Sequence, residues 1–399
     1  MTMDLSGLLE PIRRLEGYQA LRRILTDMRD LSRVAPYGIS GEVVRFWGDT
    51  LSAADVSAIL SENISRIGEN RADAIDPDAP LRIDWLVLSG GGPDGAYGAG
   101  LLAGWHARGD RPDFKLVTGV STGAIVALFA FLGPQYDDTL RTLYTAYTTK
   151  DLATRTILAG LTGGTALLDT SGYRRLIDSY VDDKMVAELA AKHRNGYTLL
   201  IGTTNLDVSR PVIWNIGAIA ASGHPAAKQL IRDVVQASSA IPAAFPPVLV
   251  PVKVDGRSYD EMHVDGGATQ QLMLFSPQIP LRRLDQALGR NLDRTIYIII
   301  NNKLRKPYDP VPPRLYSIAA TAISSLISGS GSGDIYKIYA IAERDGLELR
   351  VTWIPPEFDR EAEEMFDPNY MKALYDLGFE AGRGGVRWET SPPDFTSSE

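Results

Sequence analysis

The sequence predicts an α/β protein with a parallel sheet and helical crossovers. From residue 83 the chain reads as a buried strand (83–89), a helix (95–109), a second buried strand (114–120) and an apolar helix (123–133). Connections this short between strands and helices are typical of a parallel sheet with helical crossovers. Further strands are expected at 197–206, 248–254, 294–301 and 347–354.

The N-terminal part of the chain, 1–75, has a different pattern and predicts a helical extension. Apolar residues recur at helical spacing over 7–33, and a second helix is expected at 53–67 behind a capping-box pattern. A polar, acidic and proline-bearing stretch then separates this part from the first strand. We therefore divide the chain into an extension (1–75), a linker (76–82), a main α/β domain (83–390) and a disordered tail (391–399).

Composition excludes several classes of protein. The net charge of −8 argues against a nucleic-acid binder, and the absence of cysteine excludes disulfides and thiolate metal sites. The N-terminus lacks the apolar stretch of a signal peptide, and the longest apolar runs are too short to span a membrane. We expect a soluble protein, cytoplasmic or peripheral to a membrane. No ligand motif predicts a metal or an organic cofactor.

The second strand of the predicted unit ends in a nucleophile-elbow pattern. Gly119, Ser121 and Gly123 fit G-x-S-x-G, in which a tight turn between strand and helix exposes a serine. The flanking glycines avoid collisions with the neighbouring strand and helix. A buried strand before the motif and an apolar helix after it favour a catalytic serine over a purely structural turn.

The first strand is followed by a glycine-rich loop with two alternative functions. Gly90 to Gly95 fits the dinucleotide pattern G-x-G-x-x-G, but the second strand ends in Gly-Val-Ser rather than in the acid that would hold a ribose. Parallel strands would bring this loop and Ser121 to the same edge of the sheet. Backbone N–H groups of about Gly91 and Gly92 could then stabilise an oxyanion.

A serine nucleophile needs a base, and histidine is scarce. The chain has only four histidines, and none follows His263, which counts against the usual order of serine, acid and histidine. Asp265 ends a short strand and precedes Gly266 and Gly267, which permit a turn toward a cleft. Asp265 could accept the proton directly, although the same pattern also fits a hairpin turn. His263, two positions earlier on the same strand face, is the alternative base.

Taken together, these motifs resemble the patatin-like phospholipases. The resemblance rests on "GGGPDGAYGAG" (90–100), on "GVSTG" (119–123) and on the distal "DGG" (265–267), with "TTNLDVSRPVIWNIG" and "ASSAIPAAFPPV" before the last of these. It covers about 83–300. It implies a patatin-like fold of three layers, with a central, mostly parallel sheet between helices. It also implies a dyad of Ser121 and Asp265 without histidine, an oxyanion hole from Gly90, Gly91 and Gly92, and acyl esters of lipids as substrates.

One residue departs from the family pattern. Many members carry Arg or Lys in the glycine-rich loop, where this chain has Asp94. An acid at this position removes a plausible phosphate contact and repels anionic head groups, so it weakens the expectation of a phospholipid substrate.

The stretch 315–327 places apolar side chains at the spacing of an amphipathic helix, followed by the flexible sequence "SGSGSGD". Such a helix beside a glycine hinge could be a lid or an interfacial element. We expect the stripe to pack in the core instead, since that is the more frequent arrangement.

We therefore predict a lipid acyl hydrolase of the phospholipase A or esterase type. Its partners would be a lipid or another acyl ester, with peripheral membrane contact allowed and no nucleic acid. The alternatives are an esterase that uses His263 as its base, a nucleotide-binding protein that uses the glycine-rich loop, and a non-catalytic lipid-binding or partner-recruiting protein.

Overall fold

The computed structural model describes residues 34–39, 43–50, 81–155, 166–254, 257–274, 281–282, 292–304 and 310–392. The helices expected at 7–33 and 53–67 lie outside these residues, as does the part of the predicted tail at 393–399. Between those two expected helices, β1 (Ala35–Pro36) and β2 (Arg45–Trp47) are strands of the main sheet. The described part of the extension is therefore not helical, and it belongs to the same sheet as the predicted main α/β domain.

The centre of the sheet consists of parallel strands in the order β12-β11-β3-β4-β7. Their bounds are Glu348–Trp353, Leu292–Ile300, Leu81–Leu88, Leu116–Val120 and Thr198–Asn205. Every residue of β4 and β7 is buried, because helices cover both faces of the sheet. The α/β class, the mostly parallel central sheet and the predicted strands are confirmed.

Antiparallel strands extend the sheet beyond β7. Strand β10 (Arg257–Asp265) pairs with β7 and with β9 (Val248–Val254), and β8 (Arg210–Asn215) also pairs with β7. The two N-terminal strands complete this side, because β1 pairs with β9 and β2 pairs with β8. Short strands β5 (Thr154–Arg155) and β6 (Leu168–Asp169) form a separate pair.

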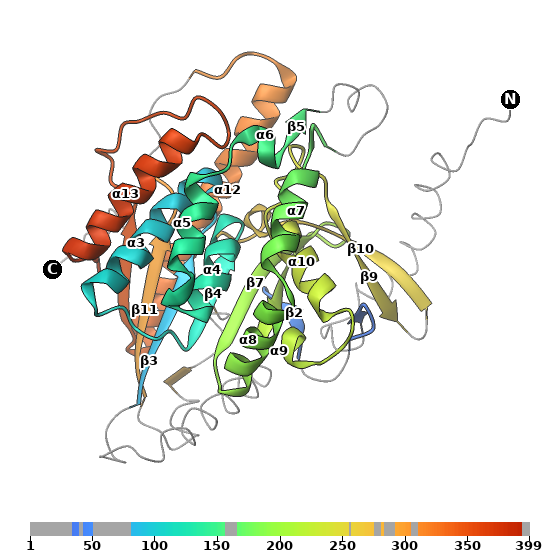
Figure 1. Ribbon diagram of the computed structural model, residues 1–399, viewed down its shortest axis with the longest axis horizontal. Coiled ribbons are helices and arrows are strands. Elements are labelled where there is room, and N and C mark those ends of the chain that lie inside the picture. The colour runs from blue at the N-terminus through green and yellow to red at the C-terminus, as the bar shows by residue number, and fades with distance from the viewer. Residues whose placement is uncertain are drawn as a thin grey trace, which may run out of the picture.

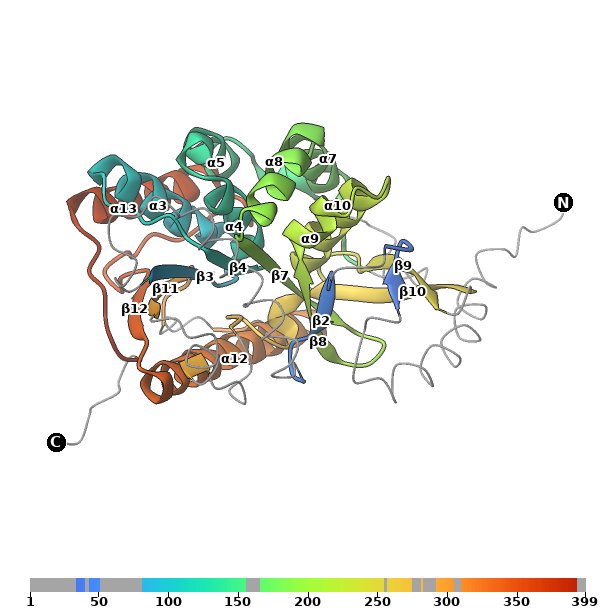
Figure 2. The same ribbon diagram turned by 90° about the horizontal axis from the view of Figure 1, so that it is seen from below.

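Most helices lie on one face of the sheet, and α12 lies on the other (Figures 1 and 2). The first group comprises α3 (Gly95–Arg108), α4 (Thr122–Leu132), α5 (Asp137–Thr145), α6 (Thr149–Leu152), α7 (Ser171–Tyr180), α8 (Asp183–Arg194), α9 (Ile216–Ala221), α10 (Ala227–Ser238) and α13 (Pro368–Gly384). Helix α12 spans Leu315–Asp345. These layers give the three-layer arrangement that the sequence predicts.

The glycines of α3 allow an unusually close contact with α13. A Cβ atom at Gly100 would lie 2.0 Å from the carbonyl oxygen of Tyr375, and one at Gly104 would lie 2.0 Å from that of Phe379. Neither neighbour can move aside, because both are backbone atoms. This contact places α13 beside the start of α3, where the glycine-rich loop ends.

Helix α12 has two unlike halves. Its second half packs under the sheet through Ile335, Ile338 and Ile341, which are at most 3% exposed. In its first half, Ile318 is 52% and Leu326 is 75% exposed. The expectation of core packing is therefore wrong for this half. The glycine stretch expected as a flexible hinge is also helical, and it joins the two halves without a break.

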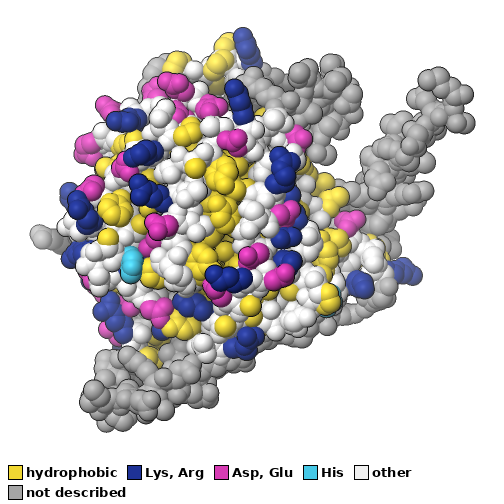
Figure 3. All heavy atoms as spheres, in the orientation of Figure 1, with side chains coloured by type: hydrophobic (Ala, Val, Ile, Leu, Met, Phe, Trp, Pro, Cys, Tyr) yellow, Lys and Arg dark blue, Asp and Glu magenta, His cyan; other side chains and the backbone are white. Residues whose placement is uncertain are grey.

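The face seen in Figure 3 carries side chains of both charges, interspersed over its described part. Hydrophobic side chains gather in a strip near the middle of this view. Among the described helices, none is long and apolar enough to cross a bilayer.

Candidate active site

Ser121 occupies a strained turn between β4 and α4. Its backbone has φ 56° and ψ −126°, a conformation that a residue with a side chain rarely adopts. The glycines on either side are required by space, because a Cβ at Gly119 would lie 2.2 Å from the carbonyl oxygen of Gly123. The Ser238 hydroxyl accepts a hydrogen bond from the Ser121 amide at 2.9 Å, which holds the turn in place.

Asp265 ends β10 and faces the same serine. Its carboxylate accepts a hydrogen bond from the Gly267 amide, which lies 2.7 Å from Oδ1, and the Ser121 hydroxyl lies near it. Burial raises the pKa of Asp265 to about 6, although the interactions with the Ser121 hydroxyl and the Gly267 amide oppose the shift. Gly266 is needed for the turn, since a Cβ there would lie 2.5 Å from the carbonyl oxygen of Gly202 in β7.

The glycine-rich loop follows β3 and lies against both Ser121 and the end of β11. A Cβ at Gly90 would be 3.1 Å from Cβ of Ser121, so the loop backbone and the serine are direct neighbours. A Cβ at Gly91 would lie 2.0 Å from the carbonyl oxygen of Asn301, which only glycine permits. After Gly91 the chain enters a short 3-10 helix, η2 (Gly92–Asp94), and then α3.

Two asparagines that the sequence analysis missed hold the carbonyl groups of this loop. The side-chain amides of Asn301 and Asn302 donate hydrogen bonds to the carbonyl oxygens of Ser89 at 3.0 Å and Gly90 at 2.8 Å. Within the described residues, by contrast, no hydrogen bond is donated by the amides of Gly90, Gly91 or Gly92. The loop therefore has its carbonyl groups anchored and its N–H groups available beside Ser121.

Both ring nitrogens of His263 contact side chains other than Ser121. Its Nδ1 lies 2.9 Å from the Thr203 hydroxyl, and its Nε2 lies 3.1 Å from the carboxylate of Glu261. Arg45 of β2 also pairs with Glu261, and the side chains of Arg45, Glu261 and His263 are almost fully buried. Because both ring nitrogens have partners, this geometry does not favour the alternative in which His263 is the base for Ser121.

Comparison with known proteins identifies the family of this region. The segment 86–276 matches the family model for Patatin-like phospholipase. This part of the chain is a patatin-like phospholipase domain. No curated protein matches the chain.

Two solved structures resemble the chain at low sequence identity. VipD from Legionella pneumophila is 12% identical, with a TM-score of 0.36 over 77% of this chain and 68% of VipD. Human GIVD cytosolic phospholipase A2 is 11% identical, with a TM-score of 0.34 over 85% of this chain and 64% of that protein.

The patatin-like domain contains the glycine-rich loop, Ser121 and Asp265, whereas Asn301, Asn302, α12 and α13 follow it in the chain. These later segments still reach the site. Tyr370 of α13 donates a hydrogen bond of 2.7 Å to the carboxylate of Asp94, the residue that departs from the family pattern. Asp94 is therefore held against α13 in the described structure.

An outer pocket of about 580 Å³ opens over the serine and the acid. Its wall includes Ile323 and Ile327 from the first half of α12, and polar side chains line it as well. Besides Asp265, the charged and amide groups among the latter are Asp94, Gln271, Asn302, Lys303 and Glu364. The size lies within the range of ligand sites in proteins, about 300–1,000 Å³.

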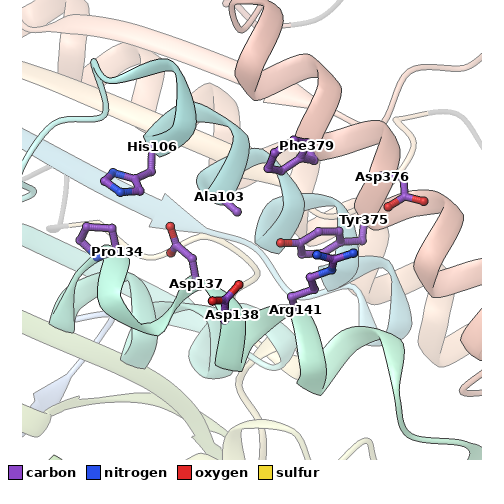
Figure 4. Close-up of a pocket in the computed structure, with 9 residues that line it drawn as sticks. All are labelled: Ala103, His106, Pro134, Asp137, Asp138, Arg141, Tyr375, Asp376 and Phe379. Atoms are coloured by element: carbon purple, nitrogen blue, oxygen red, sulfur yellow. The ribbon is translucent and has the colours of Figure 1, made fainter.

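A second pocket, of about 500 Å³, lies between α3, α5 and α13, away from these residues (Figure 4). Asp137, Asp138, Arg141 and Asp376 lie along it. The carboxylate of Asp137 is already paired with Arg111 at 2.9 Å. In the described part of the chain, no group of three His, Cys, Asp or Glu residues could hold a metal ion.

Proposed function

We propose that the protein is a lipid acyl hydrolase that cleaves carboxylic esters with Ser121 as nucleophile and Asp265 as base. The observation that carries the proposal is the strained turn of Ser121, which lies beside the buried carboxylate of Asp265 and beside loop amides that donate no hydrogen bond within the described residues. The patatin-like phospholipase match agrees with this chemistry.

The reaction would proceed in two steps. Asp265 takes the proton as the Ser121 oxygen bonds to the carbonyl carbon, and it returns that proton to the departing alcohol, which leaves an acyl-serine. In the second step, Asp265 takes a proton from water as water attacks the acyl carbon, and the proton returns to Ser121 as the acid leaves. The amides of Gly90, Gly91 and Gly92 would stabilise the oxyanion in both steps, an effect often worth about 3 kcal/mol per donor.

The test of this proposal is labelling with a fluorophosphonate probe together with ester hydrolysis. We expect the probe to modify Ser121, and we expect Ser121→Ala to abolish both labelling and hydrolysis. Labelling of another residue, or full activity of Ser121→Ala, would refute the proposal.

The surface of the first half of α12 suggests how this hydrolase reaches a substrate in a lipid layer. The stretch 315–333 carries no charged side chain, Ile318 and Leu326 are exposed, and Ile323 and Ile327 line the outer pocket. The uncharged surface is thus continuous with the mouth of the proposed active site. We propose that this half-helix contacts the lipid surface that contains the substrate.

A further inference from the structure

Two pockets border Ser121, and they differ in polarity. Besides the outer pocket, an inner chamber of about 70 Å³ also borders the serine. Gly92, Pro93, Ser121, Ile241 and Phe366 border both. An ester that reacts at Ser121 would therefore have two separate spaces available for the two groups attached to its carbonyl carbon.

The inner chamber is apolar. Among the described residues that line it, none carries a charge, whereas the outer pocket has Asp94, Lys303 and Glu364 in its wall. Aliphatic and aromatic side chains from several helices and a loop form most of its surface, namely Ile125, Leu143, Leu152, Leu176, Phe245 and Met371. An acyl chain has no polar group beyond its carbonyl, so the inner chamber suits it and the outer pocket suits the alcohol.

The volume of the inner chamber limits the length of the acyl chain that it can hold. A dry protein cavity of about 150 Å³ holds a benzene molecule, with its six carbons. The inner chamber has about half that volume. Given the hydrolase proposed above, we infer that the inner chamber binds the acyl group of the substrate and selects short acyl chains, of about two to four carbons.

Leu176 is the residue best placed to set this limit. It lines the chamber from α7 and is half-buried, so its truncation should cost less stability than that of a core leucine. Shortening it adds space, and a larger side chain removes space. Leu377 of α13 is also a half-buried leucine, but it lines neither the chamber nor the outer pocket.

The experiment is a chain-length profile with p-nitrophenyl esters from acetate to dodecanoate. We expect kcat/KM to be highest at two to four carbons and to fall at least tenfold by eight. A profile that peaks at eight carbons or more would overturn the inference while leaving the proposed hydrolase intact. Absence of any Ser121-dependent hydrolysis would instead overturn the proposed function.

Variants of Leu176 test whether the inner chamber sets the preference for acyl-chain length. Leu176→Ala should move the peak by two carbons or more toward longer chains, and Leu176→Phe should reduce butyrate hydrolysis more than acetate hydrolysis. Leu377→Ala should leave the profile unchanged. If circular dichroism shows that both Leu176 variants are folded and their profiles are unaltered, the acyl chain lies elsewhere.

Discussion

The carboxyl group of Asp265 is buried where ionisation is unfavourable, yet its proposed task requires the ionised form. With a pKa of about 6, most of the group is ionised at pH 7.5 and most is protonated at pH 5. We predict that kcat/KM for a short ester falls about tenfold per pH unit below pH 6. A profile of rate against pH checks this, and a rate that stays level down to pH 4.5 would exclude Asp265 as the base.

The same burial predicts that the ionised carboxylate of Asp265 lowers the stability of the folded protein. The pKa of Asp265 is higher in the folded chain than its ordinary value of 3.8, so its contribution to stability is present at low pH and is lost as pH rises through about 6. Asp265→Asn should therefore raise the free energy of unfolding at pH 7.5 by about 1–3 kcal/mol. Denaturation at pH 7.5 and pH 4 measures this, and the gain should shrink at pH 4.

Two buried tyrosines near Ser121 offer a matched comparison. The Tyr144 hydroxyl forms hydrogen bonds with the hydroxyl of Thr122 at 2.5 Å and with its carbonyl oxygen at 3.2 Å. The Tyr173 hydroxyl lies near Ser239 but is in hydrogen-bonding geometry with none of the described residues. We predict that Tyr144→Phe lowers the free energy of unfolding by about 1 kcal/mol, and that Tyr173→Phe leaves it unchanged or raises it. Chemical denaturation measures both, and equal losses would show that Tyr173 and Ser239 form a hydrogen bond after all.

At the scale of elements, the exposed half of α12 leads to a binding prediction. We expect Ile318→Ser with Leu326→Ser to reduce sedimentation with phosphatidylcholine vesicles at least fivefold, because the exposed apolar area is lost. Hydrolysis of a water-soluble short ester should change little. Leu249→Ser is the control, because Leu249 is 44% exposed on β9 and outside the outer pocket. Undiminished binding by the double variant would contradict the proposed lipid contact.

The glycines of α12 differ in the space around them, so alanine should affect stability differently at each. A Cβ at Gly329 or Gly333 meets no atom within 4 Å, whereas one at Gly331 would lie 3.3 Å from Cβ of Gln271 beside the acid turn. Alanine at the two open positions should stabilise the protein by about 0.5–1 kcal/mol each. Alanine at Gly331 should give a smaller gain or a loss. Thermal unfolding of the three variants distinguishes these outcomes, and three equal gains would show that the Gly331 contact has no cost.

The sequence predicts well what depends on neighbouring residues. The turn at Ser121 and the glycine-rich loop require glycines at fixed spacing, and the strands before them are continuous apolar runs, so both appear in the local pattern. The positions of Asn301 and of α12 depend on contacts between distant segments, and no local signal encodes them. The glycines of "SGSGSGD" favour flexibility, but the buried carboxylate of Asp334 accepts hydrogen bonds from the amides of Gln271 and Leu272 and fixes the helix there.

At the scale of the whole molecule, the described N-terminal strands are joined to the acid strand by a buried ion pair. Burial alone would raise the pKa of Glu261, but the charge of Arg45 and the hydrogen bond with His263 outweigh it and lower the pKa to about 2. Its stabilising effect is therefore present above the ordinary glutamate pKa of 4.5 and is lost as pH falls toward 2.

We predict that Arg45→Met costs about 3–5 kcal/mol, because it leaves the Glu261 charge buried without its main partner. Arg45→Met combined with Glu261→Met should cost clearly less. Urea denaturation of the single and double variants tests this coupling. A double variant as unstable as the sum of the two single variants would show that the two side chains act independently.

The pairing of β2 with β8 and of β1 with β9 also has a consequence for synthesis on the ribosome. The segments that form β1 and β2 are made before the whole parallel core, whereas their partners β8 and β9 are made after β3, β4 and β7. Until then, Arg45 and Trp47 have no sheet to join, and Glu261 has not yet been made. The antiparallel side of the sheet can therefore assemble only late, so that a nascent chain carries its serine turn well before it has the strand that supplies the acid.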